Sequence, residues 1–166
     1  GLPYHGGKIF YIDATGQHGL ICANQDLGLT TGNWYATYGT LVGASGTAIG
    51  TGMANTLAIV NNWSSPTCTS AGKACYDYSV TENGITYSDW FLPSLDETQL
   101  LYNASLLPVF SGRFSNGVGG SAYLTSTELN LAQCKVFNFT VGIATTLQKG
   151  SCDNSIKYSL CQISSF

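Results

Sequence analysis

Charged side chains are scarce in this sequence of 166 residues. They make up 9% of it, against roughly 25% in an ordinary soluble domain, and glycine, serine, threonine and asparagine take their place. No apolar run approaches the ~20 residues that a helix needs to cross a bilayer, so we expect no membrane insertion. A surface solvated by hydroxyls and amides is typical of extracellular proteins, although a large oligomer interface would also lower the charge content.

Motifs of the common enzyme and metal sites are missing as well. The sequence has no Gly-x-Ser-x-Gly turn to present a nucleophilic serine, and no two cysteines have the close spacing of zinc ligands. We interpret His18 as a turn histidine beside the structural cysteine Cys22. Asp153 and Asn154 supply a single carboxylate, which is too little for a calcium cage. We therefore predict no enzymatic activity, no cofactor and no metal.

The six cysteines fit three disulfides in an oxidising compartment, because their number is even. Six cysteines allow many pairings, and the alternative for any one of them is a buried thiol. We predict three bonds: Cys68–Cys75 across a short loop, Cys22–Cys161 between an early strand and the last one, and Cys134–Cys152.

The length favours a single domain over residues 1–166 with a hydrophobic core of its own. Residues 1–6 stand apart, because Gly1-Leu2-Pro3 matches one collagen-type triplet. Such a triplet would suit a stalk junction, and a tag remnant is the alternative. No signal peptide is visible, so we expect a mature or excised fragment.

The first half of the chain predicts a hairpin and a helix. Residues 8–12 and 19–23 are apolar strands around a turn that contains Gly16, and residues 24–50 are expected to form irregular loop. Thr51 is a candidate N-cap. The helix that follows it should bury the face on which Met53, Leu57 and Val60 recur.

Residues 84–102 contain the most informative local pattern. Pro93 ends a strand, and Ser94 follows as the N-cap of a helix that reaches about Ala104. Ser94 and Glu97 have the spacing of a capping box, in which each side chain bonds the main-chain amide of the other residue. Asp96 adds negative charge where the helix dipole is positive. The pattern favours helix capping over a catalytic carboxylate pair. The apolar stripe of this helix is Leu100, Leu101, Ala104 and Leu107.

After Pro108 the sequence becomes rich in strand patterns. Residues 122–126, 135–141 and 158–163 are predicted strands, and residues 112–120 are a predicted loop. Two helices followed by a late antiparallel sheet indicate an α+β fold.

Three blocks of sequence carry a family resemblance. They are Gly50-Thr51-Gly52 with Asn55-Thr56, Asp89-Trp90-Phe91-Leu92-Pro93-Ser94 with Asp96-Glu97, and Tyr123-Leu124-Thr125-Ser126-Thr127-Glu128, with a final Phe166. From about Gly7 to Phe166 the chain resembles the C-terminal domain family of the Legionella collagen-like adhesin. The resemblance implies a C-type-lectin-like fold with both chain ends in one sheet. It also implies a homotrimer that binds sulfated glycosaminoglycans on host cells.

Charge is distributed unevenly along the chain. Residues 1–103 contain two lysines and seven carboxylates, whereas residues 104–166 contain four cations and two carboxylates. Lysine and arginine bind sulfate as a point charge or as a fork, and three copies around an axis would add avidity. Scattered, solvated cations are the alternative. The candidate ligands that the resemblance suggests are Arg113, Lys135, Lys149 and Lys157.

Two features bear on this assignment. The last strand of the family usually carries arginines, and residues 159–166 contain none. Aromatic residues of a glycine-rich loop could instead stack on sugar rings, or pack in the core; they are Trp34, Tyr35, Tyr38 and Tyr4. We predict a secreted or surface-displayed bacterial adhesin domain that binds sulfated polysaccharide and mediates host attachment and biofilm formation. The sequence suggests neither a nucleic-acid nor a membrane partner. The alternative is a trimerisation cap of a fibrous stalk, without a ligand of its own.

Overall fold

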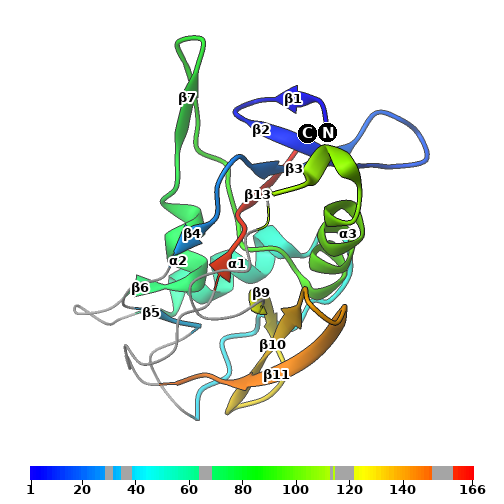
Figure 1. The fold of residues 1–166 in the computed structure, drawn as a ribbon. Helices are drawn as coiled ribbons and strands as arrows, with labels where there is room; N and C mark the ends of the chain where they lie inside the picture. Colours follow the sequence, from blue (N-terminus) through cyan, green and yellow to red (C-terminus); the bar gives the residue numbers. More distant parts are fainter. Residues whose placement is uncertain (29–31, 35–38, 64–68, 113, 115–121, 151–158) are drawn as a thin grey trace.

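The computed structural model describes residues 1–28, 32–34, 39–63, 69–112, 114, 122–150 and 159–166. These residues form an α+β fold of three α-helices and mostly antiparallel strands. In Figure 1 the two larger sheets lie at opposite ends of the molecule, and the helices lie between and beside them. The predicted fold class is confirmed, whereas the expected number of helices was too low.

One sheet contains both ends of the chain. The hairpin predicted for residues 8–12 and 19–23 is present, and the last strand pairs with it so that Ile163 lies opposite Cys22. The expectation that the chain ends share one sheet is therefore confirmed. Its strands follow the order β1 (Pro3–Tyr4), β2 (Gly7–Ile12), β3 (Gly19–Ala23) and β13 (Ile163–Ser165).

The second sheet confirms one predicted strand and corrects another. β9 covers the strand expected over residues 122–126, but the strand expected over residues 135–141 ends at Asn138. Its side-chain Oδ1 accepts bonds from the amides of Thr140 and Val141 and closes a turn there. The next strand was missed because most of its side chains are exposed, so it has no alternating pattern. The order is β11 (Ile143–Gln148), β10 (Gln133–Asn138), β9 (Ala122–Glu128), β12 (Ser159–Leu160) and β4 (Leu27–Gly28).

The strand predicted over residues 158–163 is divided between the two sheets. β12 pairs with β9 and β4, whereas β13 pairs with β3. Gln162 lies between them, and its carbonyl accepts a bond from the amide of Ala23 at 3.1 Å. Its side-chain Nε2 donates to the carbonyl of Gln25 at 3.2 Å. The last residues therefore connect the two sheets.

Two short strand pairs complete the β-structure of the described residues. β5 (Gly32–Asn33) pairs in parallel with β6 (Thr69–Ser70). β7 (Val80–Glu82) and β8 (Ile85–Tyr87) form a hairpin that projects from the body of the molecule in Figure 1. Its turn residues Asn83 and Gly84 have φ values of +52° and +81°, the left-handed conformation that a tight hairpin turn requires.

Helix α1 (Gly52–Asn61) begins where it was predicted but buries a different face. Its buried positions are Gly52, Asn55, Thr56 and Ile59, and Leu57 is exposed. The apolar stripe expected from Met53, Leu57 and Val60 is therefore wrong, because polar side chains on the buried face are hydrogen-bonded. Thr51 makes no side-chain cap and instead donates its hydroxyl to the carbonyl of Ala48 at 2.6 Å.

Helix α3 (Leu95–Ser105) confirms the predicted capping box. Glu97 accepts a bond from the Ser94 amide at 2.7 Å, and the Ser94 hydroxyl accepts one from the Glu97 amide at 3.4 Å. Leu101 and Ala104 are buried as expected, whereas Leu107 is exposed beyond the end of the helix. A 3-10 turn, η1 (Pro108–Phe110), follows. Helix α2 (Ala71–Tyr76), capped by Ser70, was not predicted.

Two main clusters of buried side chains support these elements. The first lies among α1, α2 and the second sheet, and the second lies among the first sheet, α3 and β9. Their largest members are Trp34, Ile59, Leu92 and Leu124 in the first, and Phe91, Leu101, Phe110 and Tyr123 in the second.

No disulfide bond is present among the described cysteines, so disulfide stabilisation of the fold is not confirmed. The predicted Cys22–Cys161 bond is therefore wrong for this structure, in which both residues are buried in the second cluster without a disulfide. Cys75 and Cys134 are buried in the first cluster. Cys68 and Cys152, the predicted partners of Cys75 and Cys134, lie outside the described residues. None of the helices in the described ranges is long and apolar enough to span a membrane.

Candidate functional site

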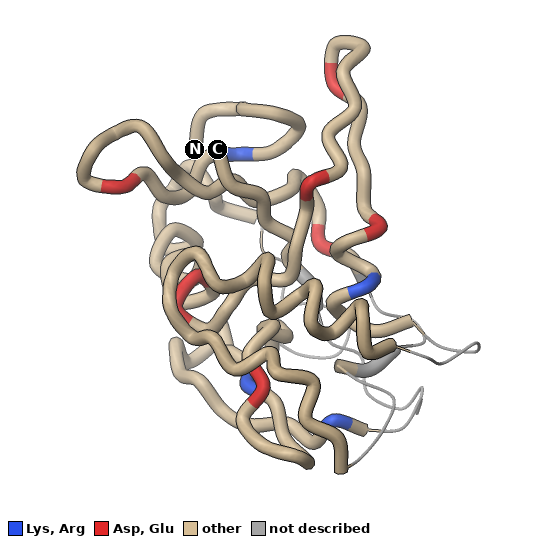
Figure 2. The backbone as a smooth tube through the Cα atoms, turned by 180° about the vertical axis from the view of Figure 1, so that it is seen from behind, with Lys and Arg blue, Asp and Glu red and all other residues tan. Residues whose placement is uncertain are grey.

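Two of the four predicted cationic ligands lie within the described residues, and these two do not form a shared surface patch. Arg113 and Lys157 lie outside the described residues. Lys149 is fully buried, and Lys135 is half-buried on β10. Figure 2 shows few Lys and Arg positions along the backbone, and several Asp and Glu positions in the half that holds the chain ends.

Lys149 is a structural residue rather than a surface ligand, which corrects its assignment. Its ammonium group forms an ion pair with Glu128, whose side chain is 2% exposed, and donates to the Thr40 carbonyl at 3.0 Å. Glu128 also accepts the amides of Val42 and Gly43, each at 3.0 Å. A lysine side chain is normally exposed to solvent, and no pattern in the neighbouring sequence indicated that Lys149 is buried. The pair fastens the loop around Thr40 to the ends of β9 and β11.

Trp34 is also buried, which excludes it as an exposed platform for a sugar ring. Its exposed fraction is 1%, and its indole N–H donates to the Thr125 carbonyl at 2.6 Å. The Lys149 ammonium lies 5.1 Å from the centre of the Trp34 rings, a distance that permits a cation–π interaction. Tyr35 and Tyr38 lie outside the described residues.

Lys135 has the surroundings expected of an anion ligand. It lies opposite Thr146 in the pairing of β10 with β11, and directly opposed residues of a pair share one face of a sheet. Thr146 is exposed. Within the described residues, no carboxylate forms an ion pair with Lys135. In contrast, the exposed Lys73 is paired with Asp77 at 2.6 Å.

The residues behind the family resemblance build the framework between α1 and α3. Besides the Ser94 amide, the Glu97 carboxylate accepts the Gly50 amide at 2.8 Å. A Cβ atom at Gly52 would overlap with that carboxylate and with the Phe91 ring, which explains the glycine. Burial raises the pKa of the Glu97 carboxyl above its ordinary value, and these hydrogen bonds oppose the shift. The residues that carry the family resemblance in this region therefore have structural roles.

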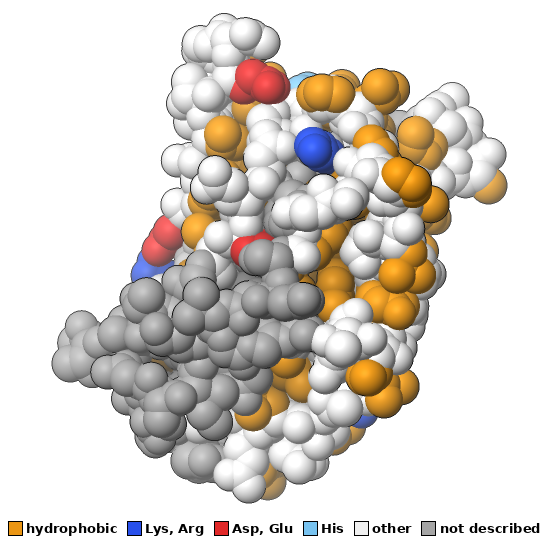
Figure 3. Space-filling model, viewed as in Figure 1, with side chains coloured by type: hydrophobic (Ala, Val, Ile, Leu, Met, Phe, Trp, Pro, Cys, Tyr) orange, Lys and Arg blue, Asp and Glu red, His pale blue; other side chains and the backbone are white. Residues whose placement is uncertain are grey.

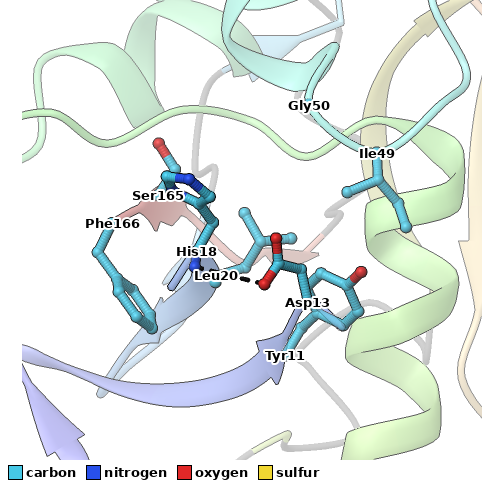
Figure 4. A pocket seen from close by; sticks show the side chains of 9 residues that line it. Tyr11, Asp13, His18, Leu20, Ile49, Gly50, Ser165 and Phe166 are labelled. Atoms are coloured by element: carbon cyan, nitrogen blue, oxygen red, sulfur yellow. Dashed lines mark hydrogen bonds between the residues drawn. The ribbon is translucent and has the colours of Figure 1, made fainter. Parts of the chain in front are cut away.

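An open pocket of the described surface lies beside the first sheet. Its volume is about 380 Å³, within the range of small-ligand pockets. Figure 4 shows Asp13 and Tyr11 at one side, Ile49 at another, and Phe166 with His18 facing them. The wall is formed by β2, the turn after it, β3, the loop before α1, and the end of β13: Tyr11, Asp13, His18, Gly19, Leu20, Ile49, Gly50, Ser165 and Phe166.

Asp13, His18 and Ser165 are the residue types of a hydrolytic triad, but their bonds differ from those of a triad. The Asp13 carboxylate contacts the main-chain amide of His18 at 3.5 Å rather than its ring. The same oxygen, Oδ1, accepts the amide and the hydroxyl of Thr15 at 3.1 and 2.7 Å. A triad instead needs the carboxylate to orient the imidazole ring. Asp13 thus holds the turn that forms the pocket rim.

An aromatic stack extends this surface. The His5 ring lies between those of Tyr4 and Tyr87, with centroid distances of 3.8 and 4.7 Å. Tyr4 in turn lies 4.8 Å from Phe166 of the pocket. His5 has a φ of +48°, an uncommon conformation for a residue other than glycine. Two of the aromatic candidates, Trp34 and Tyr4, lie within the described residues, and of these Tyr4 is exposed.

Sequence reasoning named several residues of the pocket, but in other roles. Tyr11, Gly19 and Leu20 were assigned to the first hairpin and His18 to its turn, and Gly50 and Phe166 entered only through the resemblance. Three chain segments that are distant in sequence form the pocket together, and no local sequence pattern predicts such long-range contacts. Among the described residues, no group of three or more histidine, cysteine, aspartate or glutamate side chains could hold a metal ion. Asp153 and Asn154, rejected above as a calcium cage, lie outside those residues.

Comparison with known proteins leaves the family of this chain unassigned: no model of a protein family and no curated protein matches its sequence.

Proposed function

We propose that this chain is a non-enzymatic domain of a bacterial surface adhesin, exposed to the extracellular space, that binds sulfated polysaccharide as a homotrimer. The observation that supports a sulfate ligand most directly is the position of Lys135. It is a lysine without a carboxylate partner in the described structure, beside the exposed hydroxyl of Thr146. An ammonium group and neighbouring hydroxyl donors can together hold a sulfate oxygen.

The resemblance to the adhesin family supports the same function. Its glycine-rich block and its Pro93–Ser94 block are explained as contacts between α1 and α3, so they identify a scaffold rather than a ligand site. We further propose that the fold is C-type-lectin-like. The sheet that contains both chain ends supports that description.

A trimer is part of the proposal because one lysine gives only weak attraction at physiological salt. Interactions between exposed charges are screened beyond ~8 Å, whereas three linked sites gain avidity. Figure 3 shows hydrophobic side chains along the edge near the end of α3. A second copy of the chain would cover these residues, of which Leu106 is 68% exposed: Leu2, Leu106, Leu107 and Val109.

Heparin retention tests the ligand and the site together. We expect wild-type protein to bind a heparin column at low salt, and K135Q to elute at lower salt. The matched control is K73Q, which removes the same charge from a lysine already paired with Asp77 and should elute close to wild type. Substitution of Arg113 and Lys157, which lie outside the described structure, extends the test to the other candidates.

The results separate the proposal from its alternative. If K135Q and K73Q elute at the same salt concentration, Lys135 does not belong to the site. If wild-type protein is not retained even at low salt, the trimerisation cap is the remaining function. Light scattering tests the oligomer independently. We expect the mass of a trimer for wild type and a smaller mass for L106K. The control I85K changes an exposed residue of the projecting hairpin and should leave the mass unchanged.

A further inference from the structure

The pocket that contains Asp13 is separate from the proposed sulfate site. Asp13 follows β2 of the first sheet, whereas Lys135 belongs to β10 of the second, and the two sheets lie at opposite ends of the molecule (Figure 1). The chemistry of the two places is also opposite, because the pocket carries a carboxylate and no lysine or arginine. The pocket is therefore expected to bind a ligand other than sulfate.

One charged group faces an otherwise mostly apolar space. Oδ1 of Asp13 is occupied by the bonds from Thr15 and from the His18 amide. In Figure 4 no dashed line reaches the other carboxylate oxygen, which points upward in the view and away from Tyr11. The hydroxyl of Thr15, with help from main-chain amides, lowers the pKa of Asp13 below its ordinary value despite some opposing burial. The carboxylate is thus ionised at neutral pH.

The walls around this carboxylate are aromatic and aliphatic. Tyr11 and Phe166 supply rings, and Leu20 and Ile49 supply branched side chains. Leu20 is almost fully buried, whereas Ile49 is 45% exposed and leaves the pocket open on its side. Aromatic faces attract a cation electrostatically, and aliphatic walls accept the carbon atoms attached to it.

The walls are held in place without a ligand. Phe166 and Gly19 exchange two main-chain bonds of 3.1 and 3.2 Å, and Tyr4 packs against the Phe166 ring. On the other side, the Gly50 amide is bound by Glu97. A pocket whose walls are already ordered loses less entropy when it binds. The framework residues therefore also position this pocket.

We propose that the Asp13 pocket binds an ammonium group carried on an apolar stem, such as a lysine side chain or a choline group. An anion would meet the negative carboxylate, and an uncharged apolar ligand would remove water from that carboxylate without replacing its interactions. An ammonium group pairs with the carboxylate while its carbon atoms contact the walls. The acidic balance of residues 1–103 supplies a field of the same sign.

Isothermal titration with small probes tests this ligand class on the whole chain. The probes are an acetylated lysine amide, choline, and the alcohol in which carbon replaces the choline nitrogen. We expect one or both cations to bind and the uncharged alcohol to bind about tenfold more weakly, because the alcohol lacks the charge that Asp13 attracts. Comparing the two cations distinguishes a primary from a quaternary ammonium. Equal affinity for choline and its uncharged analogue would refute the proposal, as would binding of neither cation.

Two variants assign the effect to Asp13. D13N keeps a side-chain oxygen for the Thr15 amide but removes the charge, and it should weaken cation binding about tenfold. D96N removes an exposed carboxylate from the first turn of α3 and should have no effect. Unchanged binding in D13N contradicts the assignment. Heparin retention should be the same in D13N as in wild type. A failure of the cation proposal would therefore leave the sulfate proposal intact, and a failure of the sulfate proposal would leave the cation proposal intact.

Discussion

The buried ion pair between Lys149 and Glu128 gives the strongest stability prediction. Substituting Lys149 by methionine keeps most of the buried carbon chain but removes the ammonium group. Glu128 would then remain as a carboxylate that is 2% exposed, stabilised only by the amides of Val42 and Gly43. The cation–π contact with Trp34 would be lost as well.

The expected cost follows from the burial of the pair. Removing one partner of a buried ion pair costs about 3–5 kcal/mol, a large part of the ~5–15 kcal/mol that stabilises a typical domain. Lys73 and Asp77 provide the contrast, because their side chains are 41% and 52% exposed. An exposed pair of this helical spacing contributes only about 0.3–0.5 kcal/mol, so K73M should change stability little.

Urea denaturation of four proteins measures this difference: wild type, K149M, K73M and the double variant E128Q/K149M. The double variant removes both charges while the glutamine oxygen can still accept an amide bond, so it should recover at least half of the loss in K149M. A loss in K149M no larger than that in K73M would refute the buried pair. So would a double variant that is no more stable than K149M.

Three further predictions concern the framework and the cysteines. G52A should lose about 1–3 kcal/mol, because its methyl group would overlap with the Glu97 carboxylate; unchanged stability in urea would contradict the tight contact. Because burial raises the pKa of Glu97 above its ordinary value near 4.5, the folded state binds a proton at a higher pH than the unfolded state does. Wild type should therefore gain stability relative to E97Q as pH falls from 7 toward 5, and a relative loss would contradict the shift. Burial raises the pKa of Cys134 to about 12, so its thiol should resist iodoacetamide in the native protein and react after unfolding. Rapid native labelling would contradict its burial, and no labelling of unfolded, unreduced protein would support the predicted disulfide.

Local patterns predicted the parts of the fold that depend on near neighbours. The capping box of Ser94 and Glu97 and the first hairpin are contacts between residues close in sequence, so their spacing carried the information. Helix α1 shows the limit of that approach. Its buried face contains Asn55, which bonds the main chain of Gly46, and Thr56, which bonds that of Leu92. A hydrophobic pattern cannot find a face that is buried through polar bonds to distant loops.

The functional residues were harder to predict for the same reason. Whether a lysine is a surface ligand or a buried partner depends on contacts such as that of Lys149 with Glu128, which lies 21 residues away. The Asp13 pocket combines a turn, the loop before α1 and the last strand. In both cases the decisive contacts join segments whose local sequences give no sign of one another.

The dependence of binding on sulfate tests the central claim most directly. Retention of wild-type protein can be compared on heparin and on the same polysaccharide after chemical removal of its sulfates, over one salt gradient. We predict retention on heparin that falls steeply with salt and little retention on the desulfated chain. Equal retention on both columns, or none on heparin at low salt, would contradict the proposed binding of sulfated polysaccharide.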